Sequence, residues 1–402
     1  MSSPSSSRSN RFAAAAASFV AFAGFTLVMP FLPLYFRELG VTDDRAIALW
    51  SGVSLGITPA ITAVLSPLWG RLADRFGLKI MVERSLVSFV IIMGATAFVT
   101  RPWHVFALRA IQGFFAGFGA LTVTMAAGSA RRDDLAASIG SVQIAQRLGP
   151  AMGPVVGGIL AQLFGLRMTF LVTAGFYAVA FLVVLVLYHD EPPDTPSAPK
   201  PGDGSVGIRD VLRFPHFLLL MAAIFLLQYT DRTFGPILPL YLARLGTPLT
   251  RVPFIAGVVY SIAAGTAAIG HHQCSRVLAY APARTVIAGS ALSAGAGMLA
   301  IGAATGLKMV LIGTAIFGAA SGVAMTAVYT AAGSVIPPRV RGVGFGVLTT
   351  ASLGGIALSP VLTGIIGAAS LRVAFLLNAG AMAVLAWLVV RRMSGPVKGA
   401  RA

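Results

Sequence analysis

Acidic residues, cysteine and nucleotide-binding motifs are scarce or missing in this sequence. Its 402 residues include 13 Asp and Glu against 30 Lys and Arg, and Cys274 is the single cysteine. One cysteine excludes an internal disulfide framework. The phosphate-binding pattern G-x-x-x-x-G-K-[ST] does not occur, so we do not expect ATP to drive a reaction on this chain. No Ser/His/Asp or Cys/His set stands out, and we expect neither enzymatic activity nor a cofactor.

Two further classes of protein are disfavoured. The segment His271-His-Gln-Cys274 matches no standard zinc spacing and has no second cluster of ligand residues, so we expect no metal and interpret it as a cytoplasmic helix end. The net charge of +17 could suggest nucleic acid as a partner. However, the cations are scattered in short clusters between apolar runs and form no basic face, which argues against that partner.

What the sequence has in abundance is apolar surface. Hydrophobic residues make up 56% of the chain, charged residues 11%, and the mean hydropathy is +0.84. These values lie outside the range of soluble domains, so the solvent must be a lipid bilayer. A membrane-spanning helix needs about 20 apolar residues. By that measure we predict twelve spans, over residues 12–37, 46–70, 80–100, 103–130, 137–163, 166–188, 214–243, 252–275, 283–304, 307–334, 342–366 and 370–391.

The predicted spans fall into two groups of six. The apolar run of the first span is longer than the core of a signal peptide, so we expect it to be retained. Asp190–Asp210, rich in Pro, Asp, Ser and Gly, is the best candidate for a long linker. The expected organisation is a disordered tail over 1–11, a six-helix bundle over 12–189, a linker over 190–212, a second six-helix bundle over 213–393 and a tail over 394–402.

Three short motifs recur at almost constant spacing in the two halves. Met29-Pro-Phe-Leu-Pro-Leu-Tyr35 returns as Gly235-Pro-Ile-Leu-Pro-Leu-Tyr241, at an offset of 206 residues. The other pairs are Ala126–Ser129 with Ala331–Ser334, and Gly153–Gly158 with Ser359–Gly364. The two copies of each motif are six spans apart. Because six is an even number of crossings, both copies have the same orientation in the membrane. The fold class that follows is an all-α membrane protein of 12 transmembrane helices in two pseudo-symmetric bundles, with a substrate site expected between the halves near the midplane.

Lys and Arg are distributed unevenly between the two predicted sides of the membrane. The side that holds both tails, the linker and the loop after the second span carries most of them. By the positive-inside rule, both termini should be cytoplasmic.

Charged residues are concentrated in the stretch Trp69–Lys79, between two apolar spans. We predict a short loop at the membrane face, in which Gly70 and Gly77 allow a tight turn and Asp74 is a hydrogen-bonded hub among cations. The alternative is a charged turn that only sets topology. The residues of this candidate gating loop are Gly70, Arg71, Asp74, Arg75, Gly77 and Lys79.

The predicted fifth span carries a stripe of small residues. Small residues let a neighbouring helix approach closely, and prolines bend the helix, so this span could be a seam that rocks between states. Ordinary small-residue packing is the alternative. The residues concerned are Gly149, Pro150, Gly153, Pro154, Gly157 and Gly158.

Charged residues inside spans are costly to bury in lipid and are therefore candidates for function. Asp231 is the only Asp or Glu after Asp210 and the only one in the middle of a predicted span. If a carboxylate carries a proton, Asp231 is the best candidate, and Arg109 and Arg147 are the cations that could respond to it. The alternatives are a fixed ion pair for Asp231 and a satisfied hydrogen-bond donor for Arg109.

Polar, aromatic and methionine side chains within the spans are candidates for lining a substrate cavity, although packing is the alternative for each. They are Tyr35, Gln112, Met125, Gln143, Gln146, Gln228, Tyr229, Tyr241, Met325 and Asn378.

These motifs together resemble those of the major facilitator superfamily. Gly70–Lys79 is similar to its signature loop, with Leu78 where Arg is usual, and Arg109-Ala-Ile-Gln-Gly113 resembles a fourth-span motif of proton-coupled members. Gly149–Gly158 resembles the fifth-span motif of exporters that work as antiporters. Phe25–Tyr35 looks like the first span of bacterial drug:proton antiporters, although those often carry an acid where Phe25 and Thr26 stand here.

The resemblance implies export of amphipathic toxic compounds across the bacterial inner membrane in exchange for protons, by alternating access. It also implies that the signature loop is a cytoplasmic latch between the halves. The expected partners are a small-molecule substrate, protons and the lipid bilayer, and we expect a monomer. A transporter of a defined metabolite, such as a sugar or an organic acid, and a non-transporting sensor or scaffold are the alternatives.

Overall fold

The computed structural model describes residues 4–128, 135–189, 212–336 and 341–393. In these ranges the regular secondary structure is entirely helical. Nine of the helices described are long and apolar enough to cross a membrane, or up to ten if the bent pair α9–α10 is one span. The protein is therefore a multi-pass membrane protein, as its composition predicts.

The chain divides into two compact units, and each is made of three separate segments. Unit 1 contains Met1–Val41, Ile57–Gly202 and Leu249–Ser261, and unit 2 contains Thr42–Gly56, Asp203–Pro248 and Ile262–Ala402. This division differs from the two continuous bundles expected from the sequence. The first part of α3 belongs to unit 2, and the first part of α11 belongs to unit 1.

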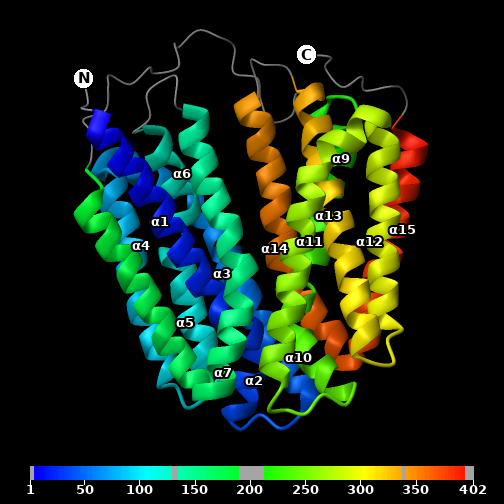
Figure 1. Ribbon diagram of the computed structural model, residues 1–402, viewed down its shortest axis with the longest axis horizontal. Helices are drawn as coiled ribbons and strands as arrows, with labels where there is room; N and C mark the ends of the chain where they lie inside the picture. Colours follow the sequence, from blue (N-terminus) through cyan, green and yellow to red (C-terminus); the bar gives the residue numbers. More distant parts are fainter. Residues whose placement is uncertain (1–3, 129–134, 190–211, 337–340, 394–402) are drawn as a thin grey trace. The chain divides into compact units, whose positions relative to one another are not determined.

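Within each unit the helices run alongside one another (Figure 1). In unit 1, α1 and α4 both pack along α7. Its elements are α1 (Pro4–Val28), η1 (Met29–Phe31), α2 (Leu32–Glu38), most of α3 (Asp44–Phe76), α4 (Leu78–Ala97), α5 (Pro102–Phe115), α6 (Phe118–Gly128) and α7 (Leu135–Leu187).

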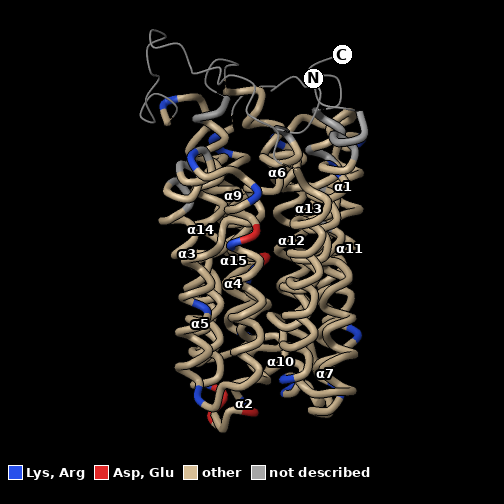
Figure 2. The backbone as a smooth tube through the Cα atoms, turned by 90° about the vertical axis from the view of Figure 1, so that its left-hand side faces the viewer, with Lys and Arg blue, Asp and Glu red and all other residues tan. Residues whose placement is uncertain are grey.

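In unit 2, α12 packs against α13 and α15, and α14 packs against α9. Its elements are α9 (Phe217–Arg232), α10 (Phe234–Arg244), most of α11 (Val252–Tyr280), α12 (Ala283–Gly302), α13 (Leu307–Val335), α14 (Arg341–Ala369) and α15 (Leu371–Arg392). Charged residues gather toward the ends of the helices and are sparse along their middle (Figure 2).

Glycine accounts for two breaks between helices of unit 1. Gly165, with φ of +79°, interrupts α7 and separates the predicted fifth and sixth spans. Gly117, with φ of +119°, separates α5 from α6 inside the predicted fourth span. A positive φ strains any residue with a side chain, so glycine is favoured at both positions. The fourth span is therefore two short helices, which the apolar pattern of 103–130 did not reveal.

The predicted end of the second span, at residue 70, and the predicted start of the third, at residue 80, need correction. α3 continues through Phe76 and α4 begins at Leu78, so the turn between them consists of Gly77 alone, with φ of +92°. The predicted turn role of Gly77 is confirmed. Gly70 lies inside α3 and takes no part in the turn.

The N-terminal segment is helical, although a disordered tail was expected there. α1 begins at Pro4. The Asn10 amide donates to the His189 carbonyl at 2.9 Å, and its oxygen accepts from the His189 N–H at 2.9 Å. Ser9 donates to the Leu187 carbonyl at 3.0 Å. These bonds satisfy backbone groups at the end of α7, which is why the polar start of α1 is held in place.

The sequence repeat corresponds to a repeated set of contacts. In unit 1 the Tyr35 hydroxyl donates to the Thr96 carbonyl at 2.6 Å, and its ring packs on Phe170 at 4.8 Å. In unit 2 the Tyr241 hydroxyl donates to the Ile301 carbonyl at 2.6 Å, and its ring packs on Phe375 at 5.1 Å. Both tyrosines are fully buried.

An arginine completes each copy of this cluster. The Arg167 guanidinium donates to the Ala97 and Val99 carbonyls at 3.3 and 3.2 Å. The Arg372 guanidinium donates to the Ala304 carbonyl at 3.4 Å. In both units the arginine caps the end of the helix that the tyrosine also contacts, so the repeat extends to side-chain hydrogen bonds.

We predict that Tyr35→Phe and Tyr241→Phe each lower the stability of the protein by about 0.5–1.5 kcal/mol, because each removes one buried hydrogen bond and leaves the packed ring in place. The midpoint of thermal unfolding in detergent measures this. Tyr280→Phe is the control, since Tyr280 is 93% exposed. Equal midpoints for all three variants would contradict a structural role for the repeated tyrosines.

Candidate functional site

The small residues of α7 bring its backbone against α1. A Cβ atom on Gly149 would lie 2.6 Å from the Ala23 nitrogen. On Gly153 or Gly157 it would overlap the Thr26 hydroxyl or the Leu27 carbonyl. Real Cβ atoms do not approach backbone so closely, so glycine is required at these positions. The close approach predicted for this stripe is therefore confirmed.

A second face of α7 meets the first part of α11, which belongs to the same unit. A Cβ on Gly158 would lie 2.6 Å from the Pro253 carbonyl oxygen, and one on Gly257 would overlap the Pro154 carbonyl. α7 thus presents glycines to helices on two of its sides.

The equivalent contact exists in unit 2. A Cβ on Gly364 of α14 would lie 2.6 Å from the Ala48 carbonyl oxygen, and one on Gly52 would overlap the Pro360 carbonyl. Pro360 and Gly364 follow Pro154 and Gly158 by 206 residues. These two glycine contacts hold the beginnings of α3 and α11 in the units to which they belong.

Arg109 is a cation buried inside unit 1, with 3% of its surface exposed. Its guanidinium donates to the Gln112 side-chain oxygen one turn further along α5. The guanidinium carbon lies 5.5 Å from the centre of the Phe25 ring on α1. The structure therefore joins the two sequence candidates Arg109 and Gln112, and adds an aromatic face that attracts the positive charge.

Two threonines of α3 fix the position of α5. The Thr58 hydroxyl donates to the Arg109 carbonyl at 2.8 Å, and the Thr62 hydroxyl donates to the Gly113 carbonyl at 3.3 Å. A Cβ on Gly113 would lie 2.7 Å from the Thr58 carbonyl oxygen. Sequence reasoning missed Thr58 and Thr62, although their spacing of four residues puts both on one helix face.

The remaining candidates of unit 1 have other surroundings. The Gln146 amide donates to the Gly119 carbonyl at 2.9 Å and to the Thr122 hydroxyl at 3.2 Å, so it joins α7 to α6. Met125 is fully buried. The side chains of Gln143 and Arg147 lie outside the described part of the structure.

Asp231 is paired with its neighbour in unit 2. An Asp231 carboxylate oxygen lies 3.5 Å from the Arg232 Nε, and the two side chains are 44% and 49% exposed. The ion pair that the sequence left open as an alternative is present. Its exposure leaves the carboxylate accessible, and a pair so exposed contributes little to stability.

The residues just before Asp231 contact α14. The Gln228 amide donates to the Ser352 hydroxyl at 2.8 Å, and the Ser359 hydroxyl donates to the Tyr229 carbonyl. A Cβ on Gly355 would lie 3.1 Å from the Tyr229 nitrogen. α9 is therefore held against α14 by polar contacts on both sides of a glycine.

Three other cavity candidates are packed inside their own unit. Tyr35 and Tyr241 are buried and bonded to carbonyls as described, so the structure favours packing over substrate contact for both. Asn378 is 3% exposed and donates to the Ala374 carbonyl at 2.7 Å. Met325 is half-buried on α13.

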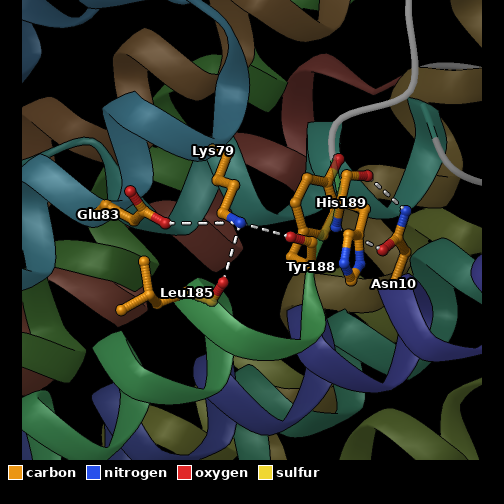
Figure 3. Close-up of polar contacts among 6 residues, drawn as sticks. All are labelled: Asn10, Lys79, Glu83, Leu185, Tyr188 and His189. Atoms are coloured by element: carbon orange, nitrogen blue, oxygen red, sulfur yellow. Dashed lines mark hydrogen bonds and ion pairs between the residues drawn. The ribbon is translucent and has the colours of Figure 1, made fainter.

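Lys79 of the candidate gating loop caps the end of α7 (Figure 3). Its ammonium donates to the Leu185 and Tyr188 carbonyls at 2.9 and 2.7 Å and lies 3.9 Å from a Glu83 oxygen. Asn10 of α1 makes hydrogen bonds to the backbone of His189, just after α7. Side chains of α1 and α4 therefore both bind the backbone where α7 ends.

These contacts give Lys79 a role inside unit 1. Sequence reasoning missed Glu83, although its spacing of four residues from Lys79 is a standard signal for a helix ion pair. Arg75, also of the loop, is exposed, with its guanidinium 5.4 Å from the Phe76 ring centre. The side chains of Arg71 and Asp74 lie outside the described part of the structure.

The histidines and the cysteine of the segment 271–274 lie on α11. Among the residues that the structure describes, no group of three or more His, Cys, Asp or Glu could hold a metal ion. His271 lies inside α11, which runs on to Tyr280, and its Nδ1 is 2.7 Å from the Thr326 hydroxyl. The predicted helix end at 271–274 is therefore wrong, because the helix extends beyond the apolar stretch that defined it.

A comparison with known families decides the classification. The profile described as Major Facilitator Superfamily matches residues 14–281. The chain belongs to the major facilitator superfamily. The repeat and the motifs of α3, α5 and α7 are thus those of a transporter superfamily, and the resemblance seen in the sequence is confirmed.

Relatives within the superfamily have a named role. The chain is 33% identical to "Multidrug resistance protein MdtG" of Proteus mirabilis (strain HI4320) over 245 residues, which are 61% of this chain and 60% of that protein. It is 33% identical to the protein of the same name from Serratia proteamaculans (strain 568) over 254 residues, 63% of this chain and 61% of that one. The matches thus span about three fifths of these relatives' length.

Solved structures support the fold over nearly the whole chain. A bacterial homologue of the human lysosomal transporter Spinster, inward-facing and occupied, has a TM-score of 0.81 at 16% identity, covering 98% of both chains. The nucleoside transporter NupG has a TM-score of 0.78 at 15% identity, covering 96% of this chain and 99% of that one. At these identities the likeness establishes the fold alone.

We predict that Gly157→Ala lowers the midpoint of thermal unfolding or abolishes folded protein, because the new methyl group would overlap the Leu27 carbonyl of α1. Gly175→Ala, in the part of α7 that follows Gly165, is the control, since a Cβ there meets nothing within 4 Å. It should leave the midpoint unchanged or raise it slightly. Equal behaviour of the two variants would show that α7 and α1 do not pack through the glycine stripe.

We predict that Lys79→Met destabilises unit 1 by about 1.5–3 kcal/mol, because hydrogen bonds from a charged donor to two carbonyls of α7 are lost. Lys308→Met is the matched control, since Lys308 is exposed at the start of α13. Thermal unfolding in detergent measures both. A Lys79 variant as stable as the Lys308 variant would contradict the capping role.

Proposed function

We propose that this protein exports amphipathic toxic compounds across the bacterial inner membrane in exchange for protons. The observation that carries the proposal is its identity of 33% to proteins named for multidrug resistance, within a family of the same fold. Both termini are assigned to the cytoplasm from the distribution of Lys and Arg. The protein acts as a secondary transporter by alternating access, without ATP.

Asp231 is the proposed proton-carrying group. Because 44% of its side chain is exposed, its carboxylate can exchange a proton without any repacking of unit 2. Protonation removes the negative charge and ends the attraction to Arg232, which lies 3.5 Å away. The Arg232 guanidinium can then attract another anion, and it repels a cationic substrate. Proton binding and substrate binding can thus exclude each other at this position, as antiport requires.

Arg109 is the proposed responding cation of unit 1. Its burial with Gln112 and the Phe25 ring leaves it sensitive to the charge and polarity of its surroundings, because low dielectric strengthens every electrostatic interaction. Thr58 and Thr62 hold the backbone of α5 and so fix the side chain in place. Arg147, whose side chain is not described, is retained as a second candidate.

The glycine contacts of α7 and α14 supply the proposed surfaces of movement. Helices that touch through glycine and backbone can slide or tilt without moving large side chains. The beginnings of α3 and α11 are seated on these surfaces, while their remaining parts belong to the other unit.

The latch role of Asp74 in the signature loop is likewise a proposal, tested by the turnover rate of Asp74→Asn.

Everted membrane vesicles loaded with a pH indicator test the function. Cationic dyes should alkalinise the acidified lumen as they enter in exchange for protons. A response to one metabolite only would favour a dedicated metabolite transporter, and no flux with any compound would favour a sensor or scaffold. Either of these results overturns the proposal.

We predict that Asp231→Asn abolishes the dependence of dye transport on ΔpH while dye binding is retained, because an amide cannot carry the proton. Asp44→Asn is the matched control: Asp44 is also paired with an arginine, Arg244 at 3.2 Å, but it is the first residue of α3, whereas Asp231 lies beside the bend between α9 and α10. It should keep transport driven by ΔpH. Proton-driven efflux at the wild-type rate in Asp231→Asn would exclude this carboxylate as the coupling group.

A further inference from the structure

A groove opens between α7 and the beginning of α11, and both of these segments belong to unit 1. Its volume is about 460 Å³. The residues that line it are Ile159, Gln162, Leu163, Arg251, Phe254 and Ile255. None of them is a candidate for proton coupling or for the substrate cavity, so the groove is a separate feature.

The groove exists because the two helices touch through backbone just beside it. At Gly158 and Pro253 the helices approach so closely that a Cβ has no room. Ile159 and Phe254, the next residue on each helix, carry large side chains that line the groove. The groove therefore lies beside the glycine contact, and larger side chains of both helices form its walls.

The walls of the groove are apolar and exposed. Leu163 is 67% exposed, Ile159 41% and Phe254 39%, and all three lie in helices that span the membrane. Exposed apolar side chains on a spanning helix are suited to hydrocarbon. A lipid chain is therefore a physically matched occupant for this part of the groove.

One end of the groove is polar. Arg251 is exposed and immediately precedes α11, and it has no ion pair with any residue in the described part of the chain. Gln162 is exposed beside it. A guanidinium and an amide offer several N–H donors and a positive charge, which match a phosphate oxygen.

The counterpart in the other half shows that these features are not general to the fold. Arg45 occupies the position of Arg251 in the repeat, but it follows Asp43 and Asp44, whereas Leu249 and Thr250 precede Arg251. The Asp43 carboxylate also accepts the Arg45 backbone N–H at 3.2 Å. Negative charge beside Arg45 disfavours an anion there.

The walls of the counterpart are also different. In the repeat alignment, Ala48, Ala368 and Ala369 stand at the positions of Phe254, Gln162 and Leu163, whereas Leu49 and Ile365 keep large apolar side chains at the positions of Ile255 and Ile159. Alanine offers neither a wall for a chain nor a hydrogen-bond donor. Two features of this groove are thus missing from its counterpart: the amide of Gln162, and an arginine that no acidic residue precedes.

We propose that this groove binds an anionic phospholipid of the surrounding bilayer. The phosphate accepts hydrogen bonds from Arg251 and Gln162, and one acyl chain lies along Ile159, Leu163 and Phe254. The volume is within the range of small-molecule sites and suits a segment of one chain rather than a whole lipid. A bound lipid would cover the exposed side chains and hold α7 to α11 beside the glycine contact.

Lipid binding to the purified protein tests the site without any transport measurement, so the result is independent of the proposed function. The protein is titrated with dioleoyl phosphatidylglycerol or dioleoyl phosphatidylcholine, and bound lipids are counted by native mass spectrometry. Wild type should prefer the anionic lipid. Arg251→Gln should weaken phosphatidylglycerol binding roughly fivefold, the effect of one cation near a membrane surface, and leave phosphatidylcholine unchanged.

Two controls separate the groove from general attraction to anions. Arg45→Gln should keep the wild-type preference, and Ile255→Trp, which fills the groove, should weaken both lipids. Glycerol phosphate without chains should not compete. An unchanged preference in Arg251→Gln, an equal loss in Arg45→Gln, or competition by glycerol phosphate at the same concentration as the lipid would each overturn the proposal.

Discussion

Close backbone contact through glycine is the constraint on which the rest of this structure depends. A helix in lipid gains no hydrophobic stabilisation from touching another helix, so packing must come from surface complementarity and hydrogen bonds. Gly153 and Gly157 let α7 lie against α1, and Gly158 lets it lie against the beginning of α11. The same contact, made by Gly364, seats the beginning of α3. These contacts assemble the helices that position Arg109, and they leave the groove at Arg251 beside them.

Polar side chains in this protein serve mostly to satisfy the backbone. The ammonium of Lys79 and the guanidinium of Arg167 donate to carbonyls at helix ends, where the last turn has no partners of its own. Thr58 donates to a carbonyl of the neighbouring helix. In a low-dielectric solvent an unsatisfied carbonyl is costly, so such bonds are favoured wherever helices end or break. The exposed pair of Asp231 and Arg232 differs from these contacts, because at the end of α9 the two side chains pair with each other.

Much of the candidate site was accessible from sequence because lipid makes charge rare. Asp231 was found as an isolated acid in an apolar run, and the α7 stripe was found from its spacing of small residues. The partners of these residues were not accessible. Phe25 beside Arg109 and Glu83 beside Lys79 are ordinary residues in sequence, and only folding brings the first pair together. Tyr35 and Tyr241 show the opposite case: the sequence left both substrate contact and packing open for them, and the structure favours packing, because both are buried and bonded to carbonyls.

The sequence by itself determined the solvent and the twofold repeat, because hydropathy and motif spacing are properties of the chain alone. It also determined the break at Gly77, since the turn is local. Only tertiary structure decided that Thr42–Gly56 and Leu249–Ser261 belong to opposite units from the rest of their helices. The physical reason is that each of these segments packs through glycine against the backbone of another helix. The residues in such a contact are far apart in sequence, so the sequence does not show which helix a segment packs against.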